Sequence, residues 1–216
     1  MKLITLTDPR SPGSEAYRTL RTNLAFYSVD EPLRTLVVTS PAPDEGKSTT
    51  IANLAVAIAQ GGRRTILVDC DLRRPSLHKI FELGNDLGLT TMVLDQNADL
   101  LLQNTGVENL SVLTSGPTPP NPADLLGSRH VDRILDLLKE RADMVLIDAP
   151  PVIGVTDAAV LGARADGVLL VVSAGKTRRD HAERAKELLE RARVRIVGVA
   201  LTNAPQDNTL GGYYEA

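Results

Sequence analysis

The sequence predicts a three-layer α/β sandwich, in which helices cover both faces of a mostly parallel, doubly wound sheet. The strand candidates are continuously apolar, as expected for strands that are buried on both faces. Segments with the apolar spacing of helices separate these strands, which favours parallel pairing. A loop with glycine and lysine follows the first long apolar run and precedes a helix, which is typical of phosphate-binding loops. Such sheets bind ligands at the carboxyl ends of their strands.

The composition is that of an ordinary globular protein. Of the 216 residues, 43% are hydrophobic and 24% are charged, so we expect one domain over residues 1–205 and a flexible polar tail over residues 206–216. The net charge of −3 and the lack of tryptophan argue against nucleic acid as a partner. The one cysteine, Cys70, excludes an internal disulfide. We expect no signal peptide, because the start, Met1-Lys-Leu-Ile-Thr-Leu-Thr-Asp, turns polar too soon. We expect no direct membrane insertion, because no apolar stretch approaches the roughly 20 residues of a membrane span.

The first helix is predicted to begin after Ser11-Pro12, in an N-terminal region over residues 1–30. Apolar side chains share one of its faces: Tyr17, Leu20, Leu24 and Tyr27. Glu15, Arg18 and Arg21 fall on a different arc of the same helix. Spacing alone favours a solvated flank with intrahelical ion pairs for these three charged residues.

The phosphate-binding loop is predicted at Ser40-Pro-Ala-Pro-Asp-Glu-Gly-Lys-Ser-Thr49, between a strand at residues 35–39 and a helix that ends near residue 60. Gly46 lets the backbone approach an anion closely, and amides at the helix N-terminus point towards it. Lys47 has the reach for the β- and γ-phosphates, and the Ser48 hydroxyl suits Mg²⁺. The expected nucleotide-binding residues of this loop are Pro43, Asp44, Glu45, Gly46, Lys47, Ser48 and Thr49. Pro41 replaces the usual first glycine, and the alternative is a plain strand–turn–helix junction.

The rest of the chain continues the alternation. Further strands are expected at residues 65–69, 110–114, 144–148, 167–172 and 196–201. Further helices are expected at about residues 75–81, 89–94, 156–164 and 180–193, and around Val131, Ile134, Leu135 and Leu138. A proline-rich segment at residues 116–122 has no periodicity and is predicted to be a rigid surface loop.

Polar residues stand at the carboxyl ends of four predicted strands. The phosphate-binding loop follows the first of these strands, and Asp69 and Asp71 stand at the end of the second. Asp148 and Asn203 stand at the ends of the other two. Because the carboxyl ends of parallel strands meet at one edge of a sheet, we expect them to form one site. A carboxylate near metal-bound phosphate can accept a hydroxyl proton or hold the hydration shell of Mg²⁺. The amide of Asn203 offers a donor and an acceptor, which suits an adenine edge.

Each of these residues also has a structural alternative. The aspartates after the second strand would then pair with Arg73 or Arg74. Asp148 would cap the helix that follows it. Asn203 would be an ordinary turn residue. The agreement of four strand ends favours the functional hypothesis.

Five segments of the chain form a set of motifs. They are Glu15-Ala-Tyr-Arg-Thr-Leu-Arg21, residues 40–49, Ile66-Leu-Val-Asp-Cys-Asp-Leu-Arg-Arg-Pro75, residues 119–126 and Val145-Leu-Ile-Asp-Ala-Pro-Pro151. In this order they resemble the oligomerisation motif Glu-x-x-Arg-x-x-Arg, the Walker A and A′ motifs, a loop and helix, and the Walker B motif of bacterial tyrosine kinases (BY-kinases). These are P-loop NTPases of capsule and exopolysaccharide export. The resemblance extends from Glu15 to Asn203.

The resemblance implies a protein-tyrosine kinase that uses ATP and Mg²⁺. Lys47 would bind phosphates, and Ser48 would bind Mg²⁺. Asp71 and Asp148 would serve the Mg²⁺ shell. Asp69 would be the base for the incoming tyrosine hydroxyl.

The resemblance also implies an assembly. Glu15, Arg18 and Arg21 would help to join copies of the chain into a ring. Tyr213 and Tyr214 of one copy would be phosphorylated in the site of the next copy. Such kinases are cytoplasmic and lie at the inner face of the plasma membrane through a transmembrane polysaccharide co-polymerase, which activates them. They regulate polymerisation and export of the polysaccharide.

The chain departs from the family pattern at three places. Asp44 stands where the family usually has glycine, Ser173 stands where relatives often carry arginine, and the tail has two tyrosines instead of a larger cluster. The short tail favours a second hypothesis, an ATP-binding assembly switch that regulates a membrane co-polymerase with little kinase activity. A third hypothesis is a partitioning or septum-site ATPase, although the signature lysine of those proteins is Ala42 here.

Overall fold

The computed structural model describes residues 3–27, 32–95 and 99–205. Within them, one sheet contains β1 (Thr35–Thr39), β2 (Thr65–Asp69), β3 (Gln103–Asn104), β4 (Leu110–Leu113), β5 (Met144–Asp148), β6 (Gly167–Ser173) and β7 (Ile196–Thr202). The strand order is β3-β4-β2-β5-β1-β6-β7, and only the β3–β4 pair is antiparallel. The predicted mostly parallel sheet is therefore confirmed.

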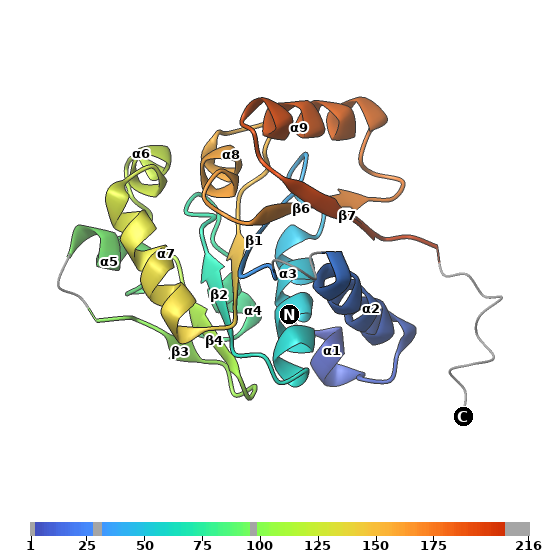
Figure 1. Cartoon of the computed structure of the whole chain (residues 1–216), viewed down its shortest axis with the longest axis horizontal. Coiled ribbons are helices and arrows are strands. Elements are labelled where there is room, and N and C mark those ends of the chain that lie inside the picture. Colours follow the sequence, from blue (N-terminus) through green and yellow to red (C-terminus); the bar gives the residue numbers. More distant parts are fainter. Residues whose placement is uncertain (1–2, 28–31, 96–98, 206–216) are drawn as a thin grey trace.

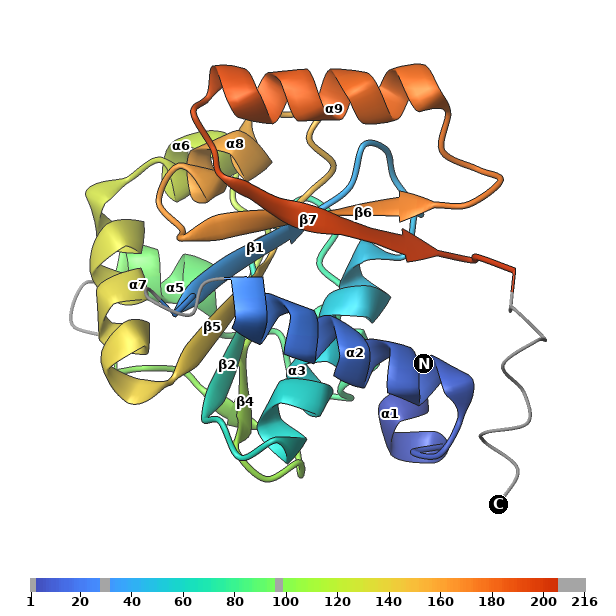
Figure 2. The same cartoon turned by 45° about the vertical axis from the view of Figure 1, so that its right-hand side comes forward.

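Helices cover both faces of this sheet (Figures 1 and 2). One face carries α1 (Ile4–Thr7), α2 (Pro12–Tyr27), α3 (Lys47–Gln60) and α4 (Leu77–Ile80). The other carries α5 (Leu89–Leu94), α6 (Pro122–Leu126), α7 (Arg129–Arg141), α8 (Asp157–Gly162) and α9 (Arg179–Arg191). This arrangement is the predicted three-layer sandwich.

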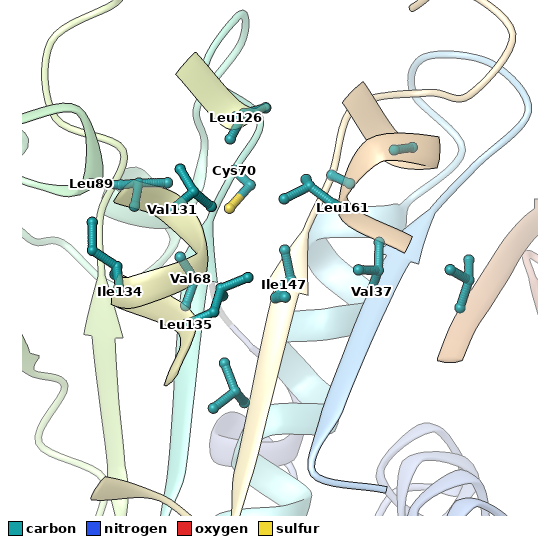
Figure 3. Packing of buried hydrophobic residues seen from close by; sticks show 14 of the residues in the cluster. Val37, Val68, Cys70, Leu89, Leu126, Val131, Ile134, Leu135, Ile147 and Leu161 are labelled. Atoms are coloured by element: carbon teal, nitrogen blue, oxygen red, sulfur yellow. The ribbon is translucent and has the colours of Figure 1, made fainter. Parts of the chain in front are cut away.

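Two hydrophobic cores lie between the layers. The core under α5 to α9 is shown in Figure 3, where Val68 of β2, Ile147 of β5 and Val37 of β1 point towards the helices. On the opposite face, Leu36 and Leu146 are fully buried against α3. Burial on both faces explains why these strands are apolar at every position.

Three short elements were not predicted from hydrophobic spacing. They are α1, β3 and α6, each of five residues or fewer. Only α6 was expected, from the resemblance of residues 119–126 to a loop and helix of the family. Elements of this length do not show a hydrophobic period. The last of them begins at Pro122, at the end of the predicted proline-rich loop, and proline is well suited to the first turn of a helix.

The prediction of burial on both faces is wrong for β7. This strand lies at the edge of the sheet, and the side chains of Val199 and Leu201 are 60% and 57% exposed. Both residues pair with β6 on one side only. An apolar run indicates a strand, but it does not give the position of that strand in the sheet.

The long N-terminal helix α2 packs on α3. Its predicted apolar face is confirmed for Leu24, which is buried, and for Tyr17 and Leu20, which are half-buried. Tyr27 is instead exposed, and the Arg195 guanidinium lies 5.0 Å from its ring centroid. Among the described helices, α2 included, none is both long and apolar enough to cross a membrane.

Candidate active site

The carboxyl ends of β2, β5 and β1 lie side by side because these strands are neighbours in the sheet. Asp69 at the end of β2 is in register with Asp148 at the end of β5. Asp148 is also in register with Val38 of β1, two residues before the phosphate-binding loop. Three of the four predicted strand ends therefore meet in one place. The fourth, at the end of β7, is separated from β1 by β6.

The phosphate-binding loop has the backbone that its sequence predicts. Gly46 has φ +87° and immediately precedes α3, where its carbonyl accepts the amide of Thr50. Asp44 has φ +58°, also in the left-handed region. Glycine is favoured there, and aspartate tolerates it better than most residues. The residue that replaces the glycine of the family pattern thus has a backbone conformation that glycine favours.

Lys47 joins the loop to two carboxylates. Its Nζ lies 2.9 Å from Asp71 Oδ2, 3.2 Å from Asp148 Oδ1 and 3.1 Å from Ser48 Oγ. Burial by itself would lower the pKa of this ammonium group. The charges of Asp148 and Asp71 outweigh burial and raise the pKa above its ordinary value. The lysine is therefore charged at neutral pH and held between the two carboxylates.

Asp148 is completely buried. Burial raises the pKa of its carboxyl group, while the charge of Lys47 and hydrogen bonds oppose that rise. One oxygen, Oδ1, contacts Lys47. The other, Oδ2, is buried and has no hydrogen-bond partner within the described ranges. A buried carboxylate oxygen normally has a donor, so this position is suited to a ligand or an ordered water.

Asp69 is also completely buried, and it is anchored to backbone. Its Oδ2 accepts the amides of Ser76 and Leu77 at the start of α4, at 3.0 and 2.9 Å, and its Oδ1 accepts the amide of Asp71 at 3.2 Å. Burial, followed by the charge of Asp148, raises its pKa to about 7. The amides of Leu77 and Ser76 partly offset this rise.

The structural alternative for these aspartates, a pairing with Arg73 or Arg74, occurs only through the backbone. The Arg74 amide donates to Asp71 Oδ1 at 3.0 Å, and in the part of the chain that the structure describes neither guanidinium group forms an ion pair with Asp69 or Asp71. Arg73 instead pairs with Asp157 at 2.9 Å, and the Asp157 side chain is fully buried. This pair ties the segment after β2 to the first turn of α8. No sequence pattern indicated Asp157, because the two residues are 84 positions apart.

A cavity of about 760 Å³ opens at these strand ends. Most of the predicted phosphate-binding residues line it: Pro43, Asp44, Gly46, Lys47, Ser48 and Thr49. Asp71 lines it as well, whereas Asp69, Asp148 and Asn203 do not. The lining also includes residues that were not predicted as part of the site, among them Arg73, Arg74, Ser76, Lys79, Ile80, Pro150, Pro151, Ile153, Val155 and His181.

Glu45 is the member of the predicted loop set that is absent from the cavity lining. Its side chain is buried, and burial raises the pKa of its carboxyl group against a hydrogen bond from Thr177 and the charge of Lys176. The loop is also fastened through its carbonyl groups. Lys176 Nζ donates to the Asp44 carbonyl at 2.6 Å, and Thr202 Oγ1 donates to the Glu45 carbonyl at 2.9 Å. These contacts hold the loop from the β6–β7 side.

Asn203 lies just beyond β7 with φ +54°, and its Nδ2 donates to Ser173 Oγ at 2.9 Å. This contact matches the alternative of a turn residue. It also gives Ser173, the second departure from the family pattern, a local partner. The adenine contact of Asn203 stays a prediction.

The charged residues of α2 have partners within the chain. Arg18 pairs with Glu15 at 2.8 Å, and Arg21 donates to the Ala57 carbonyl of α3 at 2.9 Å. The intrahelical pair expected from spacing is thus confirmed for Glu15 and Arg18. Their part in oligomerisation stays a prediction. Tyr213 and Tyr214 lie outside the described residues.

The site residues fit Mg²⁺ on the chemistry of their donors. In residues 3–27, 32–95 and 99–205, no group of three or more His, Cys, Asp or Glu side chains converges to hold a metal ion. Mg²⁺ does not need such a group, because it keeps several waters and binds proteins through one or two carboxylates together with substrate phosphates. The Ser48 hydroxyl, Asp71 and the unpartnered oxygen of Asp148 offer that limited set.

The fold and the site define a P-loop NTPase. A family profile described as ParA, NUBPL iron-transfer P-loop NTPase, matches residues 33–204. The chain is 43% identical to the tyrosine-protein kinase YwqD of Bacillus subtilis (strain 168), over 98% of this chain and 90% of the relative.

Solved structures agree with this class. The crystal structure of the chimerical protein CapA2B2 has a TM-score of 0.90 at 40% identity and covers 94% of this chain and 90% of its own. The kinase domain of the Escherichia coli tyrosine kinase ETK has a TM-score of 0.90 at 32% identity and covers 95% and 81%. The chain belongs to the bacterial tyrosine kinase family, as its motifs indicate.

Proposed function

We propose that this protein is an ATP-dependent tyrosine kinase that phosphorylates Tyr213 and Tyr214 of a neighbouring copy. The observation that carries the proposal is the contact of Lys47 with Asp71 and Asp148 beside a cavity of about 760 Å³. That volume lies in the range of pockets for small-molecule ligands. A phosphate-binding lysine and a carboxylate on one cavity are what phosphoryl transfer to a hydroxyl requires.

Each part of the loop has a role in binding MgATP. The amides of the loop and of the α3 N-terminus bind phosphate oxygens, and Lys47 binds the β- and γ-phosphates. Ser48, Asp71 and Asp148 would hold Mg²⁺, which supplies charge neutralisation when it is bound. In the transfer itself, the phenolic oxygen bonds to the γ-phosphorus and the bond to the β,γ-bridging oxygen breaks. ADP leaves with that electron pair, and the phenolic proton passes to a carboxylate.

Two aspartates are candidates for this carboxylate. The family resemblance favours Asp69, whose pKa of about 7 suits a general base. The geometry favours Asp71, because it lines the cavity and Asp69 does not. Both carboxylates accept backbone amides, and Asp71 Oδ1 accepts the amide of Arg74 at 3.0 Å. We assign the contact with the acceptor to Asp71 and the positioning of Asp71 to Asp69.

The wider role follows from the family. In this proposal, Glu15, Arg18 and Arg21 exchange part of their internal contacts for contacts with a neighbour in a ring. A transmembrane polysaccharide co-polymerase attaches the ring to the inner face of the plasma membrane and activates it. Phosphorylation of the tails then regulates capsule or exopolysaccharide polymerisation and export.

Iron transfer, which the description of the family profile names, does not fit this chain. Iron–sulfur clusters in proteins are held mostly by several cysteine thiolates. The chain has one cysteine, Cys70, and it is buried in the core.

The direct test is phosphate transfer from γ-labelled ATP with Mg²⁺, followed by mapping of phosphotyrosine by mass spectrometry. We expect phosphate on Tyr213 or Tyr214 in the wild type and none in Lys47→Met. Asp71→Asn should abolish phosphate transfer, whereas Asp69→Asn should lower the rate and leave transfer detectable. The reverse result would return the role of base to Asp69.

An assembly switch predicts a different outcome of the same experiment. The wild type would bind ATP and assemble in a nucleotide-dependent way, yet carry no phosphotyrosine even with an activating fragment of the co-polymerase. Assembly would also survive deletion of residues 211–216.

A further inference from the structure

One wall of the cavity is built from residues outside the phosphate-binding loop. It is formed by α4 and the segment before it, and by the segment between β5 and α8. Its apolar members are Ile80, Pro150, Pro151, Ile153 and Val155. The segment between β5 and α8 adjoins the phosphate-binding loop, since the Val152 amide donates to the Ser40 carbonyl at 2.9 Å, but the wall contributes none of the residues of that loop. The cavity therefore has an apolar part that phosphate does not need.

Arg74 and Lys79 stand at this wall, and both are exposed. Within the described parts of the chain, neither forms an ion pair. Arg73, on the same cavity, is already paired with the buried Asp157. The wall thus combines apolar surface with two cations that have no anionic partner among the described residues.

We propose that this wall binds the acceptor peptide and selects a tyrosine that is followed by an acidic residue. The apolar side chains receive the phenol ring, and Arg74 and Lys79 attract the carboxylate of the next residue. This inference rests on the proposed kinase function and adds the class of its peptide substrate. It makes Arg74 and Lys79 residues that determine specificity.

The tail of a second copy has the matching chemistry. Its sequence is Gly-Gly-Tyr213-Tyr214-Glu215, so an acidic residue directly follows a tyrosine. Neighbouring Cα atoms in a chain lie about 3.8 Å apart, so a carboxylate at this position stays close to the ring. Opposite charges of this kind raise the association rate and the specificity for the correct peptide more than they raise the affinity.

The test uses the full chain and a peptide of residues 207–216, amidated at its C-terminus and labelled at its N-terminus. Two quantities are measured: the KM of the peptide in phosphate transfer, and its Kd by fluorescence anisotropy in the presence of MgADP. The double variant Arg74→Glu with Lys79→Glu is compared with the wild type. The matched control is Arg133→Glu with Arg141→Glu on the exposed surface of α7, which makes the same change in charge.

We expect the cavity variant to raise the peptide KM and Kd about tenfold, which corresponds to about 1.4 kcal/mol, and to leave the KM for ATP as it is. The control variant should match the wild type. A peptide with Glu215→Lys should bind the wild type about tenfold more weakly and should recover on the cavity variant. Recovery of binding when the charges on both partners are exchanged would identify a direct contact, and it would exclude misfolding of the cavity variant as the cause of its weaker binding.

Two results would overturn the inference. One is equal binding of the unchanged peptide and the Glu215→Lys peptide by the wild-type protein. The other is a rise in the KM for ATP equal to that for the peptide, which would assign Arg74 and Lys79 to the nucleotide. A wild type that transfers no phosphate would contradict the kinase function instead, and the anisotropy would still decide whether the wall binds the acidic peptide.

Discussion

The central strands of this sheet and the edge strand β7 have similarly apolar sequences and different surroundings. β1, β2 and β5 are buried at every position, and the polar groups at their ends form a charged cluster around Lys47. β7 is equally apolar, but Val199 and Leu201 are exposed, and its end carries the neutral side chains of Thr202 and Asn203. The position of a strand in the sheet, more than its sequence, therefore decides the role of its carboxyl end. The ends of the central strands carry the charged site residues, and the end of β7 holds the phosphate-binding loop in place.

The largest effect is expected at the centre, from Lys47→Met. This change removes the ammonium group that we propose binds phosphate, so phosphotyrosine formation should fall by at least about 10³-fold. Transfer is measured with labelled ATP. Lys186→Met on α9 is the matched control, because its side chain is 64% exposed and pairs with surface charge at Glu190. Retention of transfer by Lys47→Met would remove the loop from the mechanism.

Leu146→Ala should destabilise the protein by about 2–5 kcal/mol, because Leu146 is fully buried in β5 and the change leaves a cavity. Urea unfolding at neutral pH measures the loss. Leu137→Ala on α7 is the control with the same chemistry, since Leu137 is 46% exposed. Equal losses in the two variants would contradict the packing of the central strands.

Asp69 should make nucleotide-free stability depend on pH. Its pKa is about 7 in the folded protein and 3.8 in the unfolded chain, so the folded state binds more protons between these values. The free energy of unfolding should therefore fall as the pH rises from about 4 to about 7, by at most about 1.4 kcal/mol per pH unit for this group. Asp69→Asn should remove this slope in urea unfolding, whereas Asp136→Asn on the surface of α7 should not.

Thr202→Val tests the contribution of the edge strands to the site. It keeps the shape of the side chain and removes the hydrogen bond to the Glu45 carbonyl, a loss of about 1 kcal/mol. Nucleotide affinity, measured by calorimetry, should weaken about fivefold. Thr22→Val on the exposed side of α2 serves as the control. No change in affinity would mean that the loop keeps its shape without β7.

The smallest effect is expected from Val199→Thr, within about 0.5 kcal/mol of the wild type, because this side chain is 60% exposed. The same substitution at Val145, which is fully buried in β5, places a hydroxyl in the core and should cost about 1–3 kcal/mol. Both are measured by urea unfolding. A large loss of stability in Val199→Thr would show that the exposed face of β7 is covered by another surface in solution.

Local patterns in the sequence were enough for most of the fold. Apolar runs indicated every described strand except the two-residue β3, and the loop at Gly46 and Lys47 followed from residue chemistry alone. The order of the strands depends on contacts between distant segments, so the exposure of β7 was not predictable from its own residues. The Arg73–Asp157 pair and the contact of Lys176 with Asp44 were not predictable for the same reason, because each joins residues that are far apart in the sequence. Asp69 and Asp71 were predicted together, but their different access to the cavity depends on the backbone of the segment up to α4.

The position of Lys47 has a consequence for the resting protein. Without nucleotide, its ammonium group acts as an internal counter-ion for Asp71 and Asp148, so the site does not bury negative charge alone. When phosphate draws Lys47 away, a bound cation must take over that neutralisation. The phosphate and the cation are thus expected to bind as a neutralising pair, each poorly in the absence of the other.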